Sequence, residues 1–190
     1  AFDSVALGRL RGAGTRNIIL IADEKMLHTA VNTAPASASK AGRSYCIVPA
    51  PGSALYHPKV VLHLGREKAR AIVSSANLTA SGLAGNLEIA TAIECEGPED
   101  QMAPLVSSVL YFLLSSVETG QKTVSESVDW LRRRSGWLID TPPNGQPVQR
   151  EDGSWIGFFH SGGDQTIWAQ FVTAIGSEGI EHLTVISPYW

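Results

Sequence analysis

Residues 56–64, with the sequence YHPKVVLHL, and residues 71–79, with the sequence AIVSSANLT, are two short apolar runs separated by a tight turn. Both runs have the length and the branched aliphatic content of β-strands. His57 and Lys59 are two residues apart, and residues two apart on a strand point to the same face. From residue 60 onward the opposite face carries only Val and Leu, which suits a buried side. The pattern predicts a hairpin that projects an imidazole and an ammonium together.

This pair of side chains suits chemistry at phosphorus. The neutral imidazole of His57 can attack a phosphate and form a covalent intermediate. The ammonium of Lys59 neutralises the non-bridging oxygens, and the amide of Asn77 donates to the same oxygens. Ser75 can add a hydroxyl donor. Glu88 can accept the proton on the far nitrogen of an imidazole and so fix its tautomer. The set requires no metal.

Four short motifs follow one another in this region. In order, they are His57-x-Lys59, Ser75-x-Asn77, Gly82-Leu83 and Asn86-x-Glu88. Together they resemble the HKD motif of the phospholipase D superfamily, in which His-x-Lys is followed by an Asp and then by Gly-Ser-x-Asn. The chain departs from that motif twice, because Leu64 stands near the expected Asp and Ser74 replaces the Gly. The missing Asp and the long gap before Asn77 resemble the tyrosyl-DNA phosphodiesterase and nuclease-like branches.

The resemblance implies a fold and a mechanism. Members of the superfamily consist of two similar α/β halves, and each half gives one His-x-Lys to a shared site. The catalytic residues that the resemblance implies are His57, Lys59, Asn77 and Glu88, and the substrate-binding residues are Ser74 and Ser75. No second His-x-Lys occurs in these 190 residues. The second imidazole is therefore expected from a second half or from a twofold-related copy of the chain.

Nucleic acid is the first expectation for the substrate, with cleavage or end-processing of DNA as the reaction. A phospholipid is the alternative for an enzyme. A function of another class also stays open, in which the half binds phosphate or DNA without catalysis. The simplest alternative is a β-hairpin that carries a His and a Lys on its surface and has no functional site. The formal net charge of −3 provides no overall basic field. Contacts to phosphate are therefore expected from local cations, which are Lys59, Arg66, Lys68 and Arg70.

Composition is typical of a soluble globular protein, with 44% hydrophobic residues. Cys46 and Cys95 each lie in a β-like run and are expected to be buried thiols in a reducing compartment. No Cys/His cluster has zinc spacing. The longest apolar run, residues 105–117, is interrupted by serines and is too short to span a bilayer. We expect a cytoplasmic protein without cofactor, metal or membrane association, and an excerpt of a longer chain without a secretory leader.

Strands and helices alternate along the chain, which predicts an α/β fold with a mixed β-sheet flanked by helices. Strands are expected at residues 17–22, 44–48, 57–64, 69–75, 86–95, 155–160 and 183–186. Helices are expected at residues 4–11, 24–32, 99–118, 125–134 and 164–175. Asp23 is the expected N-cap of the second helix. In the last helix, the side chains expected to face inward are Ile167, Trp168, Phe171 and Val172.

The predicted organisation has three parts. Residues 1–140 form a first phospholipase D-like half, residues 141–153 a linker, and residues 154–190 a connecting strand and helix with the first strand of a second half. One question of register stays open. A four-residue turn would pair His57 with Ala76, so that Ser75 and Asn77 would both face away from the imidazole. Three alternatives would change the direction of these side chains relative to His57. The loop could have an odd length, a bulge could intervene, or Asn77 could already lie in the loop after the strand.

Overall fold

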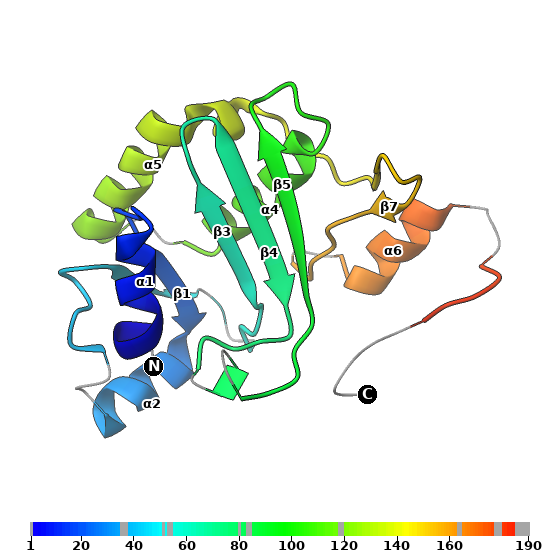
Figure 1. Cartoon of the computed structure of the whole chain (residues 1–190). Helices are drawn as coiled ribbons and strands as arrows, with labels where there is room; N and C mark the ends of the chain where they lie inside the picture. The colour runs from blue at the N-terminus through cyan, green and yellow to red at the C-terminus, as the bar shows by residue number, and fades with distance from the viewer. Residues whose placement is uncertain are drawn as a thin grey trace. The chain divides into compact units, whose positions relative to one another are not determined.

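The computed structural model describes the chain apart from residues 1, 35–37, 51, 53–54, 80, 83–84, 118–119, 163–164, 177–179 and 185–190. The chain divides into two compact units, Ala1–Asn144 and Gly145–Trp190. Their boundary lies inside the segment 141–153 that the sequence marks as a linker. Helices and strands alternate in the first unit, so the fold class is α/β, as predicted (Figure 1).

A parallel pair of strands forms one part of the first unit. β1 (Ile19–Asp23) and β2 (Cys46–Ala50) pair in parallel, and α2 (Glu24–Thr33) follows β1 in the chain. Asp23 is the N-cap of α2, as predicted, because its carboxylate accepts a hydrogen bond from the backbone N–H of Met26 at 3.0 Å. This bond satisfies one of the free donors at the start of the helix and fixes the point where strand becomes helix.

An antiparallel sheet forms the other part. β3 (Val60–Leu64), β4 (Lys68–Ser74) and β5 (Ala90–Glu96) lie side by side with β4 in the centre (Figure 1). Leu64 pairs with Ala69, so the connection between β3 and β4 is a four-residue turn over residues 65–68.

The register of this hairpin answers the question left by the sequence. Val60 pairs with Val73, and the backbone N–H of Ser74 donates to the carbonyl oxygen of Lys59 at 3.0 Å. Continued by two residues, this register places His57 opposite Ala76, as the sequence predicts for a turn of four residues.

One face of the antiparallel sheet is buried and the other is open. α4 (Ala103–Ser115) packs against β4 and β5. The sheet residues buried on this side are Ala69, Ala71, Ile93 and Cys95, and the buried residues of α4 include Leu105, Val109 and Leu110. On the opposite face Ala90 and Ala92 are exposed. Since opposed residues of an antiparallel pair share a face, Lys59 and Ser74 belong to the open side.

α5 (Lys122–Asp140) extends beyond the predicted helix 125–134 at both ends and packs beside α4 and β2. The backbone of Ser135 leaves helical geometry, with φ −132° and ψ 33°. The Ser135 hydroxyl donates to the carbonyl oxygen of Gly65 at 2.8 Å, and Trp137 Nε1 donates to the same oxygen at 3.4 Å. The kink therefore fastens α5 to the turn between β3 and β4.

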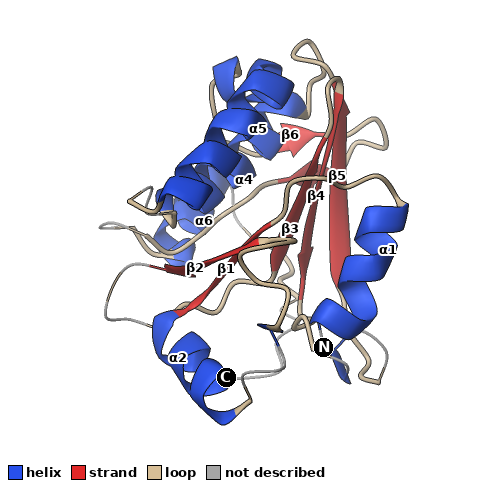
Figure 2. Ribbon diagram, turned by 90° about the vertical axis from the view of Figure 1, so that its left-hand side faces the viewer, coloured by secondary structure: helices blue, strands red, loops and turns tan. Residues whose placement is uncertain are grey.

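The N-terminal helical segment covers the parallel pair. It consists of η1 (Phe2–Ala6), a π-helical stretch, and α1 (Leu7–Gly12). Leu7, Ile18 and Tyr45 form a buried cluster between this segment and the strands. Figure 2 shows α1 on the opposite side of the strands from α4 and α5. Burying both sides of β1 and β2 is what an α/β layer requires.

Several details differ from the predictions. The sheet is not one mixed sheet: β1–β2 and β3–β4–β5 are separate, and a cavity lined by Ile19 of β1 and Leu62 of β3 lies between them. β3 begins at Val60 rather than His57, because Pro58 has no N–H to give to a ladder. Cys95 is buried and free, as predicted, whereas Cys46 is free but only half-buried.

The second unit contains β6 (Val148–Gln149), β7 (Trp155–Ile156) and α6 (Ile167–Ile175). The predicted strand 155–160 is thus only two residues long. The side chains of Ile167, Trp168 and Val172 are exposed rather than inward-facing. Of the predicted strand 183–186, residues 183 and 184 are not in a strand, and residues 185 and 186 lie outside the described residues. In the described parts of the chain, no helix is long and apolar enough to cross a membrane.

Candidate functional site

The residues singled out by the sequence gather at one end of the antiparallel sheet. His57 and Lys59 lie directly before β3, Ser74 ends β4, and Glu88 lies directly before β5. The ladder continues past the strand ends, because the backbone N–H of Ser75 donates to the carbonyl oxygen of residue 89 at 2.9 Å. Side chains from three neighbouring strands are therefore supported by one hydrogen-bonded framework.

His57 and Lys59 touch. Lys59 Nζ lies 2.8 Å from His57 Nδ1, 3.0 Å from His57 Nε2 and 3.1 Å from the carbonyl oxygen of His57. Since both ring nitrogens lie at nearly the same distance, the ammonium does not align with the lone pair of either one alone. The imidazole is exposed and Lys59 is half-buried. The imidazole and the ammonium are thus adjacent, and the ring is exposed to solvent.

Glu88 is held in a small polar network. The Ser75 hydroxyl donates to Glu88 Oε2 in a short hydrogen bond, and Asn86 Nδ2 donates to Glu88 Oε1 at 3.2 Å. Ser75 Oγ also accepts a hydrogen bond from the backbone N–H of Ile89 at 3.0 Å. Both carboxylate oxygens are therefore engaged, one by the residue that follows β4 and one by a residue shortly before β5. Among the described contacts, Glu88 makes no hydrogen bond to His57.

The charge of Glu88 acts on Lys59. Burial lowers the pKa of Lys59 from its ordinary value, and the nearby Glu88 carboxylate opposes that shift. Glu88 thus contributes a counter-charge to the lysine and a fixed acceptor for Ser75. The sequence predicts that Glu88 orients an imidazole of the site. Among the described contacts, Glu88 is a neighbour of the Lys59 cation, and both of its oxygens accept hydrogen bonds from Ser75 and Asn86.

Asn77 and Ser75 occupy different positions relative to His57. The side chain of Ser75 is committed to Glu88 and Ile89, whereas Asn77 is exposed in the loop after β4. A position of Asn77 in the loop after the strand is one of the three alternatives that the sequence left open. Gly82 closes the loop, because a Cβ at that position would lie 2.4 Å from the carbonyl oxygen of Asn77. The glycine is therefore required where the backbone returns past Asn77.

A residue that sequence reasoning did not assign to the site is Asp23. Besides capping α2, its Oδ2 atom accepts a hydrogen bond from the backbone N–H of Tyr56 at 3.0 Å. The hydrogen bonds from Met26 N–H and Tyr56 N–H lower the pKa of Asp23. Asp23 thus ties the segment that carries His57 to the end of β1. The signal available in the sequence was an Asp directly after a buried strand, where functional α/β sites gather.

Two of the cations expected to contact phosphate are paired with carboxylates. Lys68 forms an ion pair with Glu96, and Arg70 Nη2 lies 2.7 Å from Glu94 Oε1. Exposed pairs of this kind contribute little to stability, yet they reduce the cationic character of the open sheet face. His63, opposite Arg70 on β3, has its pKa lowered by burial and by that arginine.

No family model matches the chain, and neither the curated proteins nor the solved structures contain a match. Within the residues that the structure describes, no three His, Cys, Asp or Glu side chains gather into a group that could hold a metal ion.

Proposed function

We propose that this chain supplies one half-site of a metal-independent phosphodiesterase of the phospholipase D type. The observation that supports this most directly is the contact between Lys59 Nζ and the ring of His57, 2.8 Å from Nδ1, beside the Glu88 network. An exposed imidazole next to a half-buried ammonium is suited to nucleophilic attack on a phosphodiester. The phospholipase D-like half of the fold belongs to the same proposal.

In the proposed reaction a ring nitrogen of His57 attacks phosphorus. A P–N bond forms and the P–O bond to the leaving group breaks, with its electron pair on the leaving oxygen. Lys59 and Asn77 hold the non-bridging oxygens, and Ser74 lies on the same sheet face as Lys59. Water then attacks phosphorus and gives a proton to the second imidazole of the site, which has lost its own proton to the leaving oxygen. The P–N bond breaks, a phosphomonoester is released and neutral His57 is restored.

The leaving oxygen requires a proton from the far side of phosphorus. One imidazole cannot attack and protonate in the same step, because the two positions lie on opposite sides of the reacting atom. The second imidazole therefore comes from a second phospholipase D-like half or from a twofold-related copy. The loss of one such role costs about 10²–10⁴-fold in rate, so the 190-residue chain alone should be nearly inactive.

Nucleic acid is the proposed substrate, with cleavage or end-processing as the reaction. The test is cleavage of labelled DNA by the intact protein, with and without EDTA, beside hydrolysis of phosphatidylcholine. We expect DNA cleavage that survives EDTA and is lost in His57→Ala. His28→Ala is the matched control, since His28 is an exposed histidine of α2.

Each other outcome has a defined meaning. Undiminished DNA cleavage by His57→Ala would refute the nucleophile. Hydrolysis of phosphatidylcholine without DNA cleavage would replace nucleic acid by lipid as the substrate. DNA binding that depends on Lys59 without any turnover would leave a phosphate-binding half and remove the catalytic claim.

A further inference from the structure

Half of the chain's arginines line two adjoining cavities that lie apart from the candidate site. Of the ten arginines in the sequence, five line these cavities, and we call them the arginine track: Arg43, Arg11, Arg16, Arg134 and Arg66. The first cavity has a volume of about 340 Å³ and the second of about 410 Å³. Arg16, Asn17 and Trp130 line both, so the two are continuous.

The charge of this region is opposite to that of the chain. The formal net charge of the whole sequence is −3, but Glu126 is the one carboxylate among the described residues that line either cavity. Glu126 is itself 3.8 Å from Lys122 Nζ. A cationic strip on an acidic protein is the local footprint expected for a polyanionic ligand.

One face of α5 forms a wall of the track. Thr123, Ser127, Trp130 and Arg134 are spaced by three or four residues and therefore lie on the same side of the helix. Arg132 lies off this side and contacts Asp129 at 3.4 Å instead. The periodicity explains why only one of the three consecutive arginines of α5 enters the track.

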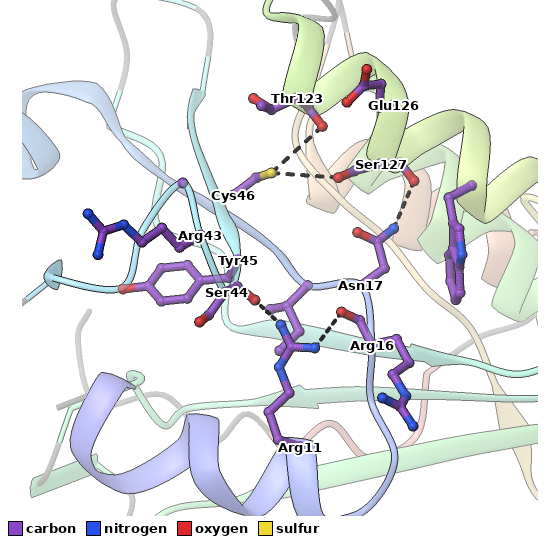
Figure 3. A pocket seen from close by; sticks show the side chains of 13 residues that line it. Arg11, Arg16, Asn17, Arg43, Ser44, Tyr45, Cys46, Thr123, Glu126 and Ser127 are labelled. Atoms are coloured by element: carbon purple, nitrogen blue, oxygen red, sulfur yellow. Dashed lines mark hydrogen bonds between the residues drawn. The ribbon is translucent and has the colours of Figure 1, made fainter.

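The arginines of the first cavity have different roles. Arg11 is structural: its Nη1 donates to the carbonyl oxygen of Arg16 at 2.8 Å, and its Nη2 donates to that of Ser44 (Figure 3). No described carboxylate pairs with the guanidinium of Arg16 or Arg43. These two side chains lie on either side of Arg11 and point away from one another (Figure 3). Diverging cations suit a chain of spaced phosphates better than one small anion.

The second cavity adds apolar surface to this charge. Leu62, Leu113 and Leu131 are among its lining residues, together with Arg66 and Arg134. Trp130, 37% exposed, stands where the two cavities meet. An exposed indole between arginines is the arrangement by which proteins stack a base while holding the phosphates on either side.

We propose that the arginine track binds a single-stranded segment of nucleic acid, with phosphates on Arg16 and Arg43 and a base on Trp130. This inference rests on the proposed function in taking the substrate to be nucleic acid. His63 lines the second cavity and lies four residues after Lys59. At about 3.3 Å per residue of strand, the end of the track is roughly 13 Å from the candidate site along the chain. The track would thus hold substrate beyond the scissile bond.

The test is fluorescence anisotropy with a labelled 20-nucleotide oligothymidine and the full chain carrying His57→Ala, so that the probe is not cleaved. Affinity is measured from 50 to 300 mM NaCl. The track variant is Arg16→Gln with Arg43→Gln, and the matched control is Arg9→Gln with Arg133→Gln, which changes the net charge equally outside the track. We expect the slope of log affinity against log salt to fall by about 1.4 in the track variant, since each single-strand phosphate contact contributes about 0.7.

A second pair of variants tests stacking. Trp130→Ala should weaken binding about 5- to 150-fold, which corresponds to about 1–3 kcal/mol per stacked base, and Trp130→Phe should restore most of the affinity. Equal salt slopes for the track variant and the control would overturn the proposal, as would unchanged binding by both Trp130 variants.

The remaining outcomes separate this inference from the proposed function. If Lys59→Ala abolishes binding while the track variant binds like the parent, the track is wrong and the proposed function stands. If the track binds DNA but the intact protein cleaves none, the proposed function is wrong and the track stands. Binding to phosphatidylglycerol vesicles, without binding to the oligonucleotide, would overturn the track in favour of a membrane surface.

Discussion

Replacing Glu88 with Gln changes one charge in the candidate site and almost no volume. In the wild type, the carboxylate accepts hydrogen bonds from the Ser75 hydroxyl and, at 3.2 Å, from Asn86 Nδ2. A carboxamide has only one acceptor oxygen, so its NH₂ group must face one of these two donors. Glu88→Gln therefore replaces a charged acceptor by a neutral group, and either the Ser75 hydroxyl or the Asn86 amide must turn so that it accepts from the new NH₂ group.

The expected cost follows from the number of bonds affected. A hydrogen bond to a charged group contributes about 1.5–3 kcal/mol. Because Glu88 is only partly buried, water can replace part of what is lost, and we expect the free energy of unfolding to fall by about 1–2 kcal/mol. Urea denaturation of wild type and variant measures this value directly.

The same substitution should move the pH profile of phosphodiester cleavage in the intact protein. In the proposed mechanism Lys59 must be protonated to hold phosphate oxygens, so the expected activity declines as the pH rises through the pKa of Lys59. Burial lowers that pKa and Glu88 counteracts the shift. Removing the carboxylate charge lowers the pKa further, and the basic limb of the profile should therefore move to lower pH.

The matched control is Glu94→Gln, which removes an exposed carboxylate of β5 that pairs with Arg70. It should change the free energy of unfolding by less than about 1 kcal/mol and leave the basic limb in place. An unmoved limb in Glu88→Gln, or a shift of equal size in the control, would refute the assignment of Glu88 as the partner of Lys59.

Three further predictions concern the framework of the site. Leu110→Ala, at a position 1% exposed, should lower the free energy of unfolding by about 2–5 kcal/mol, whereas Leu87→Ala, fully exposed at 101%, should change it by less than about 0.5 kcal/mol in the same urea titration. Burial raises the pKa of the Cys95 thiol to about 11. A thiol reagent at pH 8 should therefore modify only the half-buried Cys46 in the native protein, and both cysteines in denaturant. Two reactive thiols in the folded chain would contradict the burial of Cys95. Asp23→Ala should lower both the thermal midpoint and activity, because the acceptor for the Tyr56 N–H is lost. Since its hydrogen bonds lower the pKa of Asp23, the wild type should be more stable than the variant at neutral pH, and this difference in stability should vanish as the pH falls below about 4. A variant as stable as the wild type at pH 7 would argue against this role.

Local patterns in the sequence predicted the first unit well. Alternation predicted that His57 and Lys59 share one face, whereas the register of β3 against β4 stayed open in the sequence and follows from the four-residue turn that the structure shows. The Asp after an Ile-rich run predicted the N-cap of α2. Each of these features depends on residues within a few positions of one another, and backbone geometry relates such residues directly.

Contacts between distant segments were not predictable in the same way. The separation of β1–β2 from β3–β4–β5 depends on side chains from four elements that meet at one cavity. The link from Asp23 to Tyr56 joins residues 33 positions apart. The tie from Ser135 to Gly65 spans 70 positions and requires a local departure from helical geometry. In these cases tertiary contacts determine which of several locally allowed conformations forms, and the periodicity of the sequence does not reveal those contacts.

The core and the candidate site depend on the same register. Four residues of the sheet are buried against α4: Ala69, Ala71, Ile93 and Cys95. Because side chains alternate along a strand, the residues between them point to the open face, and so does Lys59. A slip of one residue between β3 and β4 would bring a lysine toward the core, where an unpaired charge is costly. The turn at residues 65–68 is held by two donors from α5 on the Gly65 carbonyl oxygen, and Asp23 holds the other end of the segment through Tyr56. The position of the imidazole is thus determined by hydrogen bonds at both ends of a five-residue strand, and substitutions far from His57, at Ser135 or Asp23, should affect chemistry through register and placement.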